Sequence, residues 1–306
     1  MTDKKETNGK LIFVISEQGN CGKSTISVGI ADQLRKNGKQ CAVYLLDNMD
    51  GAKSTYDRLK EIDGEGFVVK DQDPEFGVKI IDVLNQGGEK KPEDFIEDEE
   101  QTNEIKDSNK EAVNEFLNSL RKKYEYALYD FPGQSFSLLK NLFKNVEGVN
   151  GEETESELET TLKMTKKDIY IVIPIMEEKS MASLSALNNM FKFKNTKLLE
   201  RIHIVAIYNE VKEDTKFKYE TFTEHSTTAA VKAARHGNFH IFRLLHLNNN
   251  YLPLMKGHPY SYYYDEEEDE PLNLEDVTTE EVTFLLFIRR LLRQGFIPIT
   301  KKLFLS

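Results

Sequence analysis

The chain has 306 residues, enough for one large domain or two ordinary ones, and 39% apolar with 30% charged residues suits a globular protein. Its net charge of −11 excludes a generic nucleic-acid binder, although a local basic patch would still bind phosphates. Two cysteines make no disulfide framework, the polar N-terminus lacks the apolar core of a signal peptide, and no apolar run reaches the roughly 18 residues of a membrane span. We therefore expect a cytoplasmic protein.

The first part of the chain has the pattern of a strand, a glycine-bearing turn, a helix and a second strand. Residues 11–16 form a continuous apolar run, which is typical of a strand buried on both faces. Apolar residues then recur at one-turn spacing through 26–34, and Gly38 suits the end of that helix. Residues 41–47 read as the next buried strand. This order predicts parallel strands joined by a right-handed crossover.

Strands and helices continue to alternate along the chain. A capping pattern, Thr278 or Thr279 followed by Glu281, opens the last predicted helix. The fold class we predict is α/β, a doubly wound, mostly parallel sheet with helices on both faces. The remaining predicted strands are 124–130, 169–176, 203–209 and 239–247, and the helices between and after them are 111–123, 180–191 and 277–296.

Three charged stretches interrupt this pattern, near 61–110, 148–160 and 262–273. We interpret them as solvated insertions into a single domain that spans 1–306. Only one short element, within 76–84, is expected inside the first insertion.

Residues 17–25, EQGNCGKST, form the turn between the first strand and the first helix. Backbone N–H groups leading into a helix N-terminus bind phosphate, because the aligned amides and the helix dipole favour negative charge. Lys23 would reach the β- and γ-phosphates, and the Ser24 hydroxyl would ligate Mg²⁺. Glu17 replaces the first glycine of G-x-x-x-x-G-K-[ST]. The residues predicted to contact the nucleotide here are Gln18, Gly19, Asn20, Cys21, Gly22, Lys23, Ser24 and Thr25.

The stretch ALYDFPGQS supplies an acid at the end of a neighbouring strand. Asp130 would hold a water bound to Mg²⁺, and Pro132 with Gly133 would form a turn whose Gly133 N–H senses the γ-phosphate. The other interpretation of Asp130 is a helix cap or a turn residue.

The order of GNCGKST, a strand ending in LLDNMD, then YALYDFPGQS and IYIVIPIM resembles the ParA/MinD group of deviant Walker ATPases. The resemblance covers the core strands and not the acidic insertions. The G-N-x-G-K form of the loop is similar to the plasmid-stability StbB-like branch. The resemblance implies an ATPase switch that binds ATP and Mg²⁺, forms a homodimer, and acts in plasmid partition, stability, conjugation or the positioning of cargo.

The resemblance also implies roles for single residues. Asp47, at a strand end, would serve Mg²⁺ indirectly, and Asp50, in the following loop, would orient the attacking water. Their spacing departs from the family's D-x-D, so these two roles are exchangeable. Asn209 matches the position that contacts adenine, and NEVKED lacks the N-K-x-D guanine pattern, which favours ATP over GTP. The predicted catalytic residues are Lys23, Asp50 and Asp130, and the predicted metal ligands are Ser24, Asp47 and Asp130.

Gln18 stands where the family it resembles carries a lysine that reaches the phosphates of the partner subunit. A cation supplied in trans can contribute about 10³–10⁵ in rate to phosphoryl transfer. The neutral Gln18 therefore predicts slow intrinsic hydrolysis, with the missing charge supplied by a partner protein or by Lys53.

Several alternatives stay open. The basic cluster Arg289, Arg290, Arg293, Lys301 and Lys302 is either a solvated helix end or a contact for DNA or an anionic membrane. Cys21 is either a small loop residue or a redox thiol. The histidines show no metal-ligand spacing with the cysteines. Two other functions compete with the switch: a small-molecule ligase resembling dethiobiotin synthetase, with a substrate pocket within 210–240, and a nucleotide-binding scaffold with little hydrolysis.

Overall fold

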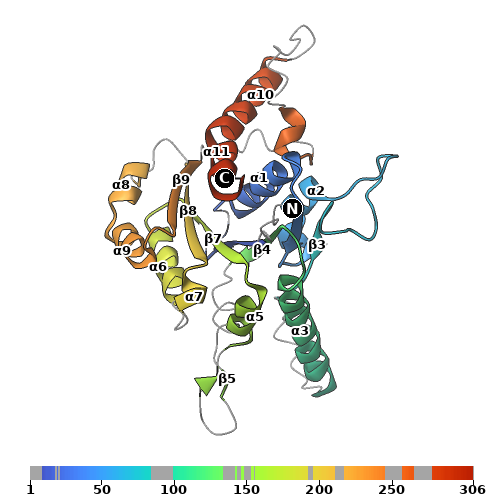
Figure 1. Ribbon diagram of the computed structural model, residues 1–306. Coiled ribbons are helices and arrows are strands. Elements are labelled where there is room, and N and C mark those ends of the chain that lie inside the picture. Colours follow the sequence, from blue (N-terminus) through green and yellow to red (C-terminus); the bar gives the residue numbers. More distant parts are fainter. Residues whose placement is uncertain are drawn as a thin grey trace, which may run out of the picture.

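The computed structural model describes residues 9–17, 19, 21–83, 99–133, 142, 146–147, 153–154, 156–191, 196–210, 217–244, 257–264 and 278–305. Its centre is a seven-stranded sheet in the order β3-β2-β4-β1-β7-β8-β9, in which all neighbours are parallel (Figure 1). The predicted fold class is thus confirmed. The strands are β1 (Lys10–Ser16), β2 (Cys41–Leu45), β3 (Lys79–Ile80), β4 (Tyr126–Gly133), β7 (Asp168–Ile175), β8 (Ile202–Asn209) and β9 (Phe239–Leu244).

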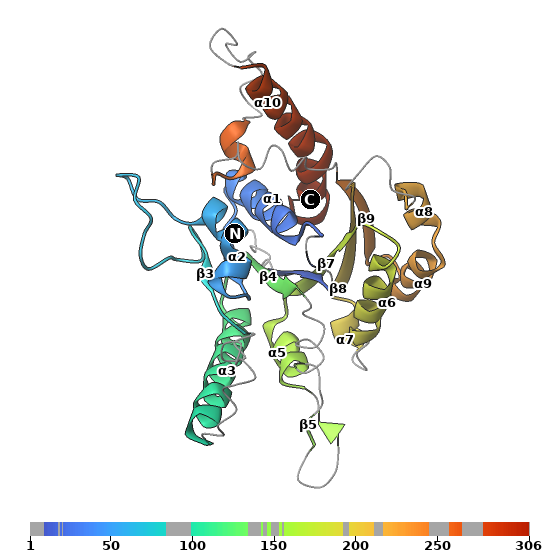
Figure 2. The same cartoon turned by 180° about the vertical axis from the view of Figure 1, so that it is seen from behind.

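Helices cover both faces of the sheet, and each face has its own apolar core (Figures 1 and 2). The side chain of Phe13 in β1 belongs to the core under α3 (Glu99–Leu120), α5 (Glu157–Thr165) and α6 (Ser180–Met190). The next residue, Val14, belongs to the core under α1 (Lys23–Lys36) and the C-terminal helices. Burial on both sides explains why β1 is apolar at every position instead of at alternate ones.

The helix α1 begins directly after the turn that follows β1, as predicted. Gly22 precedes it with a φ of 89°, a left-handed conformation that favours glycine. The chain leaves α1 at Asn37, and Gly38 has a φ of 69°. Because β1, β2 and β4 are parallel, their carboxyl ends share one edge of the sheet with the N-terminus of α1.

Two local predictions near this edge were wrong. The segment after β2 is a helix, α2 (Met49–Leu59), and not a loop, because the Asn48 side chain accepts a hydrogen bond from the Gly51 N–H at 2.8 Å and caps it. Pro132 and Gly133 do not form a turn. They continue β4, where the pairing with β1 shifts register and Ser16 lies opposite Gly133. Such an irregularity accommodates a proline that cannot donate to the ladder.

The charged stretches are only partly described. Residues 61–83 contain β3, which matches the short element expected within 76–84, and α3 already begins at Glu99, within the predicted insertion. Residues 84–98, 148–152 and 265–277 lie outside the described residues. Ser156 caps α5, and the two-residue strands β5 (Val146–Glu147) and β6 (Glu153–Thr154) pair antiparallel.

Three further helices complete the layer beside β7 to β9. They are α7 (Thr196–Leu199), α8 (Tyr219–Glu224) and α9 (Ser226–Arg235). The buried side chains of Phe222 in α8 and Val231 in α9 belong to the same apolar core as Phe13.

The predicted closing helix is longer than 277–296 and packs on α1. Its elements are α10 (Thr279–Leu291), the π-helical turn η5 (Leu292–Phe296), α11 (Ile297–Thr300) and η6 (Lys301–Leu305). Thr278 and Glu281 form the expected capping box. Phe296 lies so close to α1 that a Cβ added to Gly29 would stand 2.3 Å from its ring. The short helix η3 (Tyr260–Tyr263) packs beside them, with Tyr260 stacked on Phe296.

Candidate nucleotide-binding site

The turn before α1 brings Lys23 next to two glycines. A Cβ built on Gly133 would lie 4.0 Å from the Lys23 Nζ and 3.9 Å from the Gly19 Cα. The loop backbone, the ammonium group and the end of β4 therefore meet at one point, as the paired motifs predict. Gln18 and Asn20 lie outside the described residues. Ser24 is half-buried in the first turn of α1, while Cys21 is buried and forms no disulfide.

Asn209, at the end of β8, packs against the same loop. Its Nδ2 donates a hydrogen bond to the Cys21 carbonyl oxygen at 3.2 Å, and a Cβ on Gly22 would stand 2.4 Å from that nitrogen. The side chain thus fixes the phosphate loop to the carboxyl edge of the sheet. Its predicted contact with adenine stays a prediction.

Asp130 lies in β4 beside β1 and β2, and its side chain is buried. The Thr55 hydroxyl of α2 donates a hydrogen bond to its Oδ2 at 2.9 Å. Burial raises the pKa of Asp130 to about 6, while the positive charge of Lys23 and the Thr55 hydrogen bond act in the opposite direction. Burial favours the neutral acid, so a cation beside the carboxylate would stabilise its charged form.

Asp47 follows β2 and is half-buried. Its Oδ1 accepts a hydrogen bond from the Asn48 N–H at 2.8 Å. Burial raises the pKa of Asp47, whereas the Asn48 N–H and the charge of Lys23 lower it. The negative charge of Asp47 in turn raises the pKa of Asp130. Both acids therefore interact with one lysine and with each other, which is the arrangement predicted for the metal side of the site.

These side chains suit Mg²⁺. The ion prefers oxygen ligands, keeps several waters, and is usually bound by one or two carboxylates together with substrate phosphates. Ser24, Asp47 and Asp130 offer one hydroxyl and two carboxylates. Among the described residues, no group of three or more His, Cys, Asp or Glu side chains could hold a metal alone.

Asp50 and Lys53 are both exposed on α2. Asp50 is in the first turn of that helix, where a carboxylate interacts favourably with the helix dipole. The structure does not bring either side chain to Lys23, and their predicted roles stay predictions.

The sequence reasoning missed two residues around the site. Thr55 is the first. The sequence does contain a pattern that indicates its burial, because Ala52, Thr55 and Leu59 recur at helical spacing and are the buried residues of α2. The second is Tyr260, whose phenol is hydrogen-bonded to Thr25 and accepts a hydrogen bond from Arg58 Nη1 at 3.2 Å. No sequence signal links Tyr260 to the phosphate loop, since more than two hundred positions separate it from Thr25.

The basic cluster lies on and after α10. The guanidinium groups of Arg289 and Arg293 stand 5.8 and 5.5 Å from the centre of the Tyr264 ring. Lys302 lies over the Phe242 ring, and Arg290, Arg293, Lys301 and Lys302 are exposed. Contact with DNA or an anionic membrane stays open. Within the described ranges, no helix is long and apolar enough to cross a bilayer.

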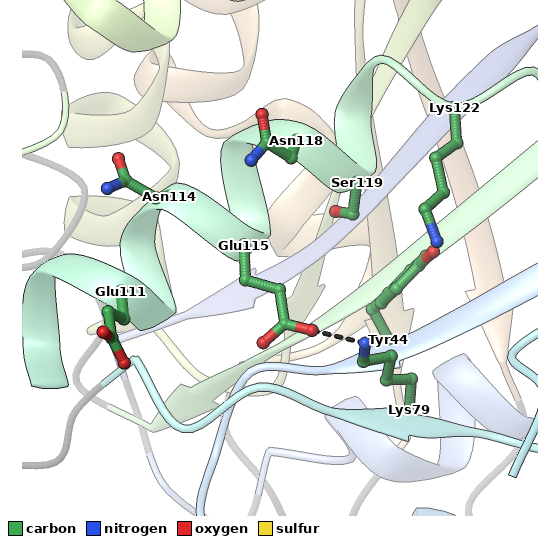
Figure 3. A pocket seen from close by; sticks show the side chains of 8 residues that line it. All are labelled: Tyr44, Lys79, Glu111, Asn114, Glu115, Asn118, Ser119 and Lys122. Carbon is green, nitrogen blue, oxygen red and sulfur yellow. Dashed lines mark ion pairs between the residues drawn. The ribbon is translucent and has the colours of Figure 1, made fainter. Parts of the chain in front are cut away.

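A pocket of about 320 Å³ opens beside α3, and none of the residues that line it is a predicted site residue (Figure 3). An ion pair between Lys79 and Glu115 spans it. A second pocket of about 270 Å³ lies between α3 and α5. Neither of these two pockets is lined by residues of 210–240, where the ligase alternative places its substrate.

Comparison with known proteins adds a family match. The model of the family described as the CobQ/CobB/MinD/ParA nucleotide binding domain matches residues 12–227, more than half of the chain. A search of curated proteins found no match. The matched range contains the phosphate loop, both acids and Asn209.

Several solved structures are similar to the chain. A plasmid partition protein from Borrelia burgdorferi is 16% identical over 81% of this chain and 95% of its own, with a TM-score of 0.40. The MinD cell division protein of Aquifex aeolicus is 16% identical over 94% and 98%, with a TM-score of 0.39. An ATP complex of Cyanothece McdA is 10% identical over 97% of each chain, with a TM-score of 0.45.

Proposed function

Because the chain belongs to the CobQ/CobB/MinD/ParA nucleotide-binding domain family, we propose that it is an ATP-binding switch that hydrolyses ATP slowly and dimerises with nucleotide. The observation that carries the proposal is the meeting of Lys23, the loop glycines and two partly or fully buried acids at one sheet edge. This arrangement supplies donors for the phosphates on one side and oxygen ligands for Mg²⁺ on the other.

Each residue has a role in this proposal. The N–H groups of the loop and the Lys23 ammonium bind the phosphates, and the Ser24 hydroxyl and the Asp47 and Asp130 carboxylates hold the Mg²⁺ side. Mg²⁺, when bound, neutralises charge on the phosphate oxygens. In this proposal the Gly133 N–H would contact the γ-phosphate, and Asp50 would orient the attacking water. Asn209 contacts the adenine, which makes ATP the preferred nucleotide.

Slow hydrolysis follows from Gln18, which is neutral at a position where a cation would stabilise the transition state. We assign the missing charge to Lys53, which is exposed on α2, or to a partner protein that stimulates hydrolysis. A long-lived ATP state suits a switch in plasmid partition, stability, conjugation or cargo positioning in the cytoplasm. In the dimer, the exposed basic cluster of the C-terminal helices is the surface that would contact DNA phosphates.

Sedimentation with different nucleotides tests the switch. We expect a monomer with ADP and a dimer with Mg²⁺ and either ATP or a non-hydrolysable analogue. Tight ATP binding by a chain that stays monomeric would contradict the switch and favour the ligase or the scaffold.

Single-turnover hydrolysis by the purified chain tests the rate. We expect turnover well below about 1 s⁻¹, the lower end for ordinary enzymes. A faster rate that is unaffected by Lys53→Ala would contradict the role given to Gln18 and Lys53.

A further inference from the structure

Thr55 links α2 to the buried acid of the metal side. The side chain of Thr55 is fully buried, and its hydroxyl donates to Asp130 Oδ2 at 2.9 Å. The link is local to the sheet edge, because β2 pairs with β4 so that Leu45 lies opposite Asp130. The Leu46 N–H also donates to the Asp130 carbonyl oxygen at 2.9 Å. The chain then continues through Asp47 into α2, and Thr55 of this helix contacts the Asp130 side chain.

A hydrogen bond to one carboxylate oxygen restricts how the group can turn. With Oδ2 held by Thr55, the carboxylate is restrained from turning, and Ser27 of α1 also interacts with the same group. Mg²⁺ needs near-ideal octahedral geometry, so a metal-side carboxylate must be held in one orientation. Outer partners that orient ligating carboxylates contribute substantially to metal affinity.

We infer that Thr55 is a positioning residue, which orients Asp130 toward the Mg²⁺ of the bound nucleotide and makes that orientation depend on the place of α2. This inference rests on the proposed function. The opposite, exposed side of α2 carries Met49, Asp50 and Lys53. A movement of α2 away from β4 by about 1 Å would take the Thr55 hydrogen bond out of range.

Two substitutions separate this role from simple packing. Thr55→Val keeps the shape of the side chain and removes the donor, whereas Thr55→Ser keeps the donor and removes a methyl group. If Thr55 only packs the core, Ser should be at least as harmful as Val. If the hydrogen bond matters, Ser should behave like the wild type and Val should not.

The measurement is the Mg²⁺ concentration that gives half of the Mg²⁺-dependent gain in ATP affinity, by calorimetry at fixed pH. We expect Thr55→Val to raise it about tenfold, since a hydrogen bond to a charged group is among the stronger ones. ATP affinity in EDTA should not change, and Thr55→Ser should stay within about twofold of the wild type. An unchanged Mg²⁺ requirement for Val, or equal losses for Val and Ser, would overturn the inference.

A double-mutant cycle of Thr55→Val with Asp130→Ala, which removes the acceptor, tests the contact independently when it is read as denaturant midpoints without nucleotide. We expect the two changes together to shift the midpoint by less than their sum, and strict additivity would also overturn the inference. The wild-type titration keeps the two proposals apart. No ATP binding by the wild type would reject the proposed function and the metal role of Thr55 with it, whereas normal wild-type binding with an unaffected Val variant rejects only the positioning role.

Discussion

Lys23 is the residue on which the two halves of the site depend. Its ammonium stands near Gly133 and Gly19, and its charge opposes the rise in pKa of both Asp47 and Asp130. The charge that would bind the phosphates under the proposed function therefore also stabilises the two carboxylates in their ionised form.

Lys23→Ala should abolish the stabilisation by nucleotide. Mg²⁺ and ATP at a hundred times the dissociation constant should raise the free energy of unfolding of the wild type by about 2.7 kcal/mol. Without the ammonium group the phosphates lose their main counter-charge, and this gain disappears. Chemical unfolding with and without ATP measures it. Lys232→Ala, an exposed change on α9, is the matched control and should keep the full gain. The site would be wrong if the wild type showed no gain.

Asp130→Asn should separate metal binding from folding. The amide can still accept the Thr55 hydrogen bond, so the protein should fold, but it carries no charge for Mg²⁺. We expect weak ATP binding that no longer improves when Mg²⁺ is added, measured by calorimetry with Mg²⁺ or EDTA. Equal Mg²⁺ dependence in the variant and the wild type would make Asp130 a structural residue only.

At the scale of the secondary-structure elements, α1 packs tightly against the C-terminal helices. Gly29 has no Cβ because Phe296 occupies that space, and Phe296 is in turn stacked on Tyr260. Tyr260 reaches the first turn of α1 through Thr25. The C-terminal helices thus pack directly against α1, the helix that follows the glycine-bearing turn.

Gly29→Ala should be destabilising. The new methyl group would lie 2.3 Å from the Phe296 ring, and overpacking of a core costs about 1–3 kcal/mol. Denaturant midpoints measure the loss. Gly64→Ala is the control, because nothing lies within 4 Å of its Cβ position, and we expect a change within about 0.5 kcal/mol. Adding Phe296→Leu should restore part of the loss in Gly29→Ala. Equal midpoints for the two alanine variants would refute the packing argument.

The elements show what sequence patterns can and cannot predict. Buried parallel strands are continuous apolar runs, so β1, β2, β7 and β8 were found within a few residues of their ends. The turn between β1 and α1 could be predicted because a glycine-bearing stretch separates an apolar run from a helical pattern, while its binding of phosphate stays a prediction. The helix α2 was missed, since its first turn is polar and its cap, Asn48, was read as part of a loop. Contacts such as Thr55 with Asp130 depend on how α2 lies over β4, and no local pattern encodes that.

At the scale of the whole molecule, the edge of the sheet opposite the phosphate loop is held by aromatic and basic side chains. His203 of β8 stacks on Tyr170 of β7 with ring centres 4.5 Å apart. Its Nδ1 lies 3.3 Å from Nε2 of His240 in β9. Burial, followed by the charges of His240 and Lys10, lowers the pKa of His203 to about 4. Burial and Lys302 lower the pKa of His240.

Global stability should therefore fall in mildly acidic solution. A histidine whose pKa is lowered by folding contributes stability that is complete above its ordinary pKa of about 6.5. That contribution is lost as the pH falls from about 6.5 toward 4, because the unfolded chain takes up the proton first. His203→Phe keeps the stack on Tyr170 and removes the titrating group. We expect its free energy of unfolding to fall less than that of the wild type between pH 7 and pH 5.

The control for the pH series is His236→Asn. His236 is exposed at the end of α9 with a φ of 44°, a conformation that asparagine tolerates. Between pH 7 and pH 5, the free energy of unfolding of this variant should fall as much as that of the wild type. Parallel slopes for His203→Phe and the wild type would show that His203 does not govern acid stability.

The same edge joins distant parts of the chain. Lys10 donates to the carbonyl oxygens of Leu303 and Phe304, which are 293 and 294 positions away, and the Tyr126 hydroxyl donates to the Phe304 carbonyl oxygen at 2.6 Å. β1 is the central strand of the sheet, so these contacts tie the middle of the fold to residues far along the chain. Long-range contacts of this kind slow folding. During synthesis α1 is made long before Thr279–Leu305, so the apolar face that it shares with those residues stays uncovered while the intervening chain is being made.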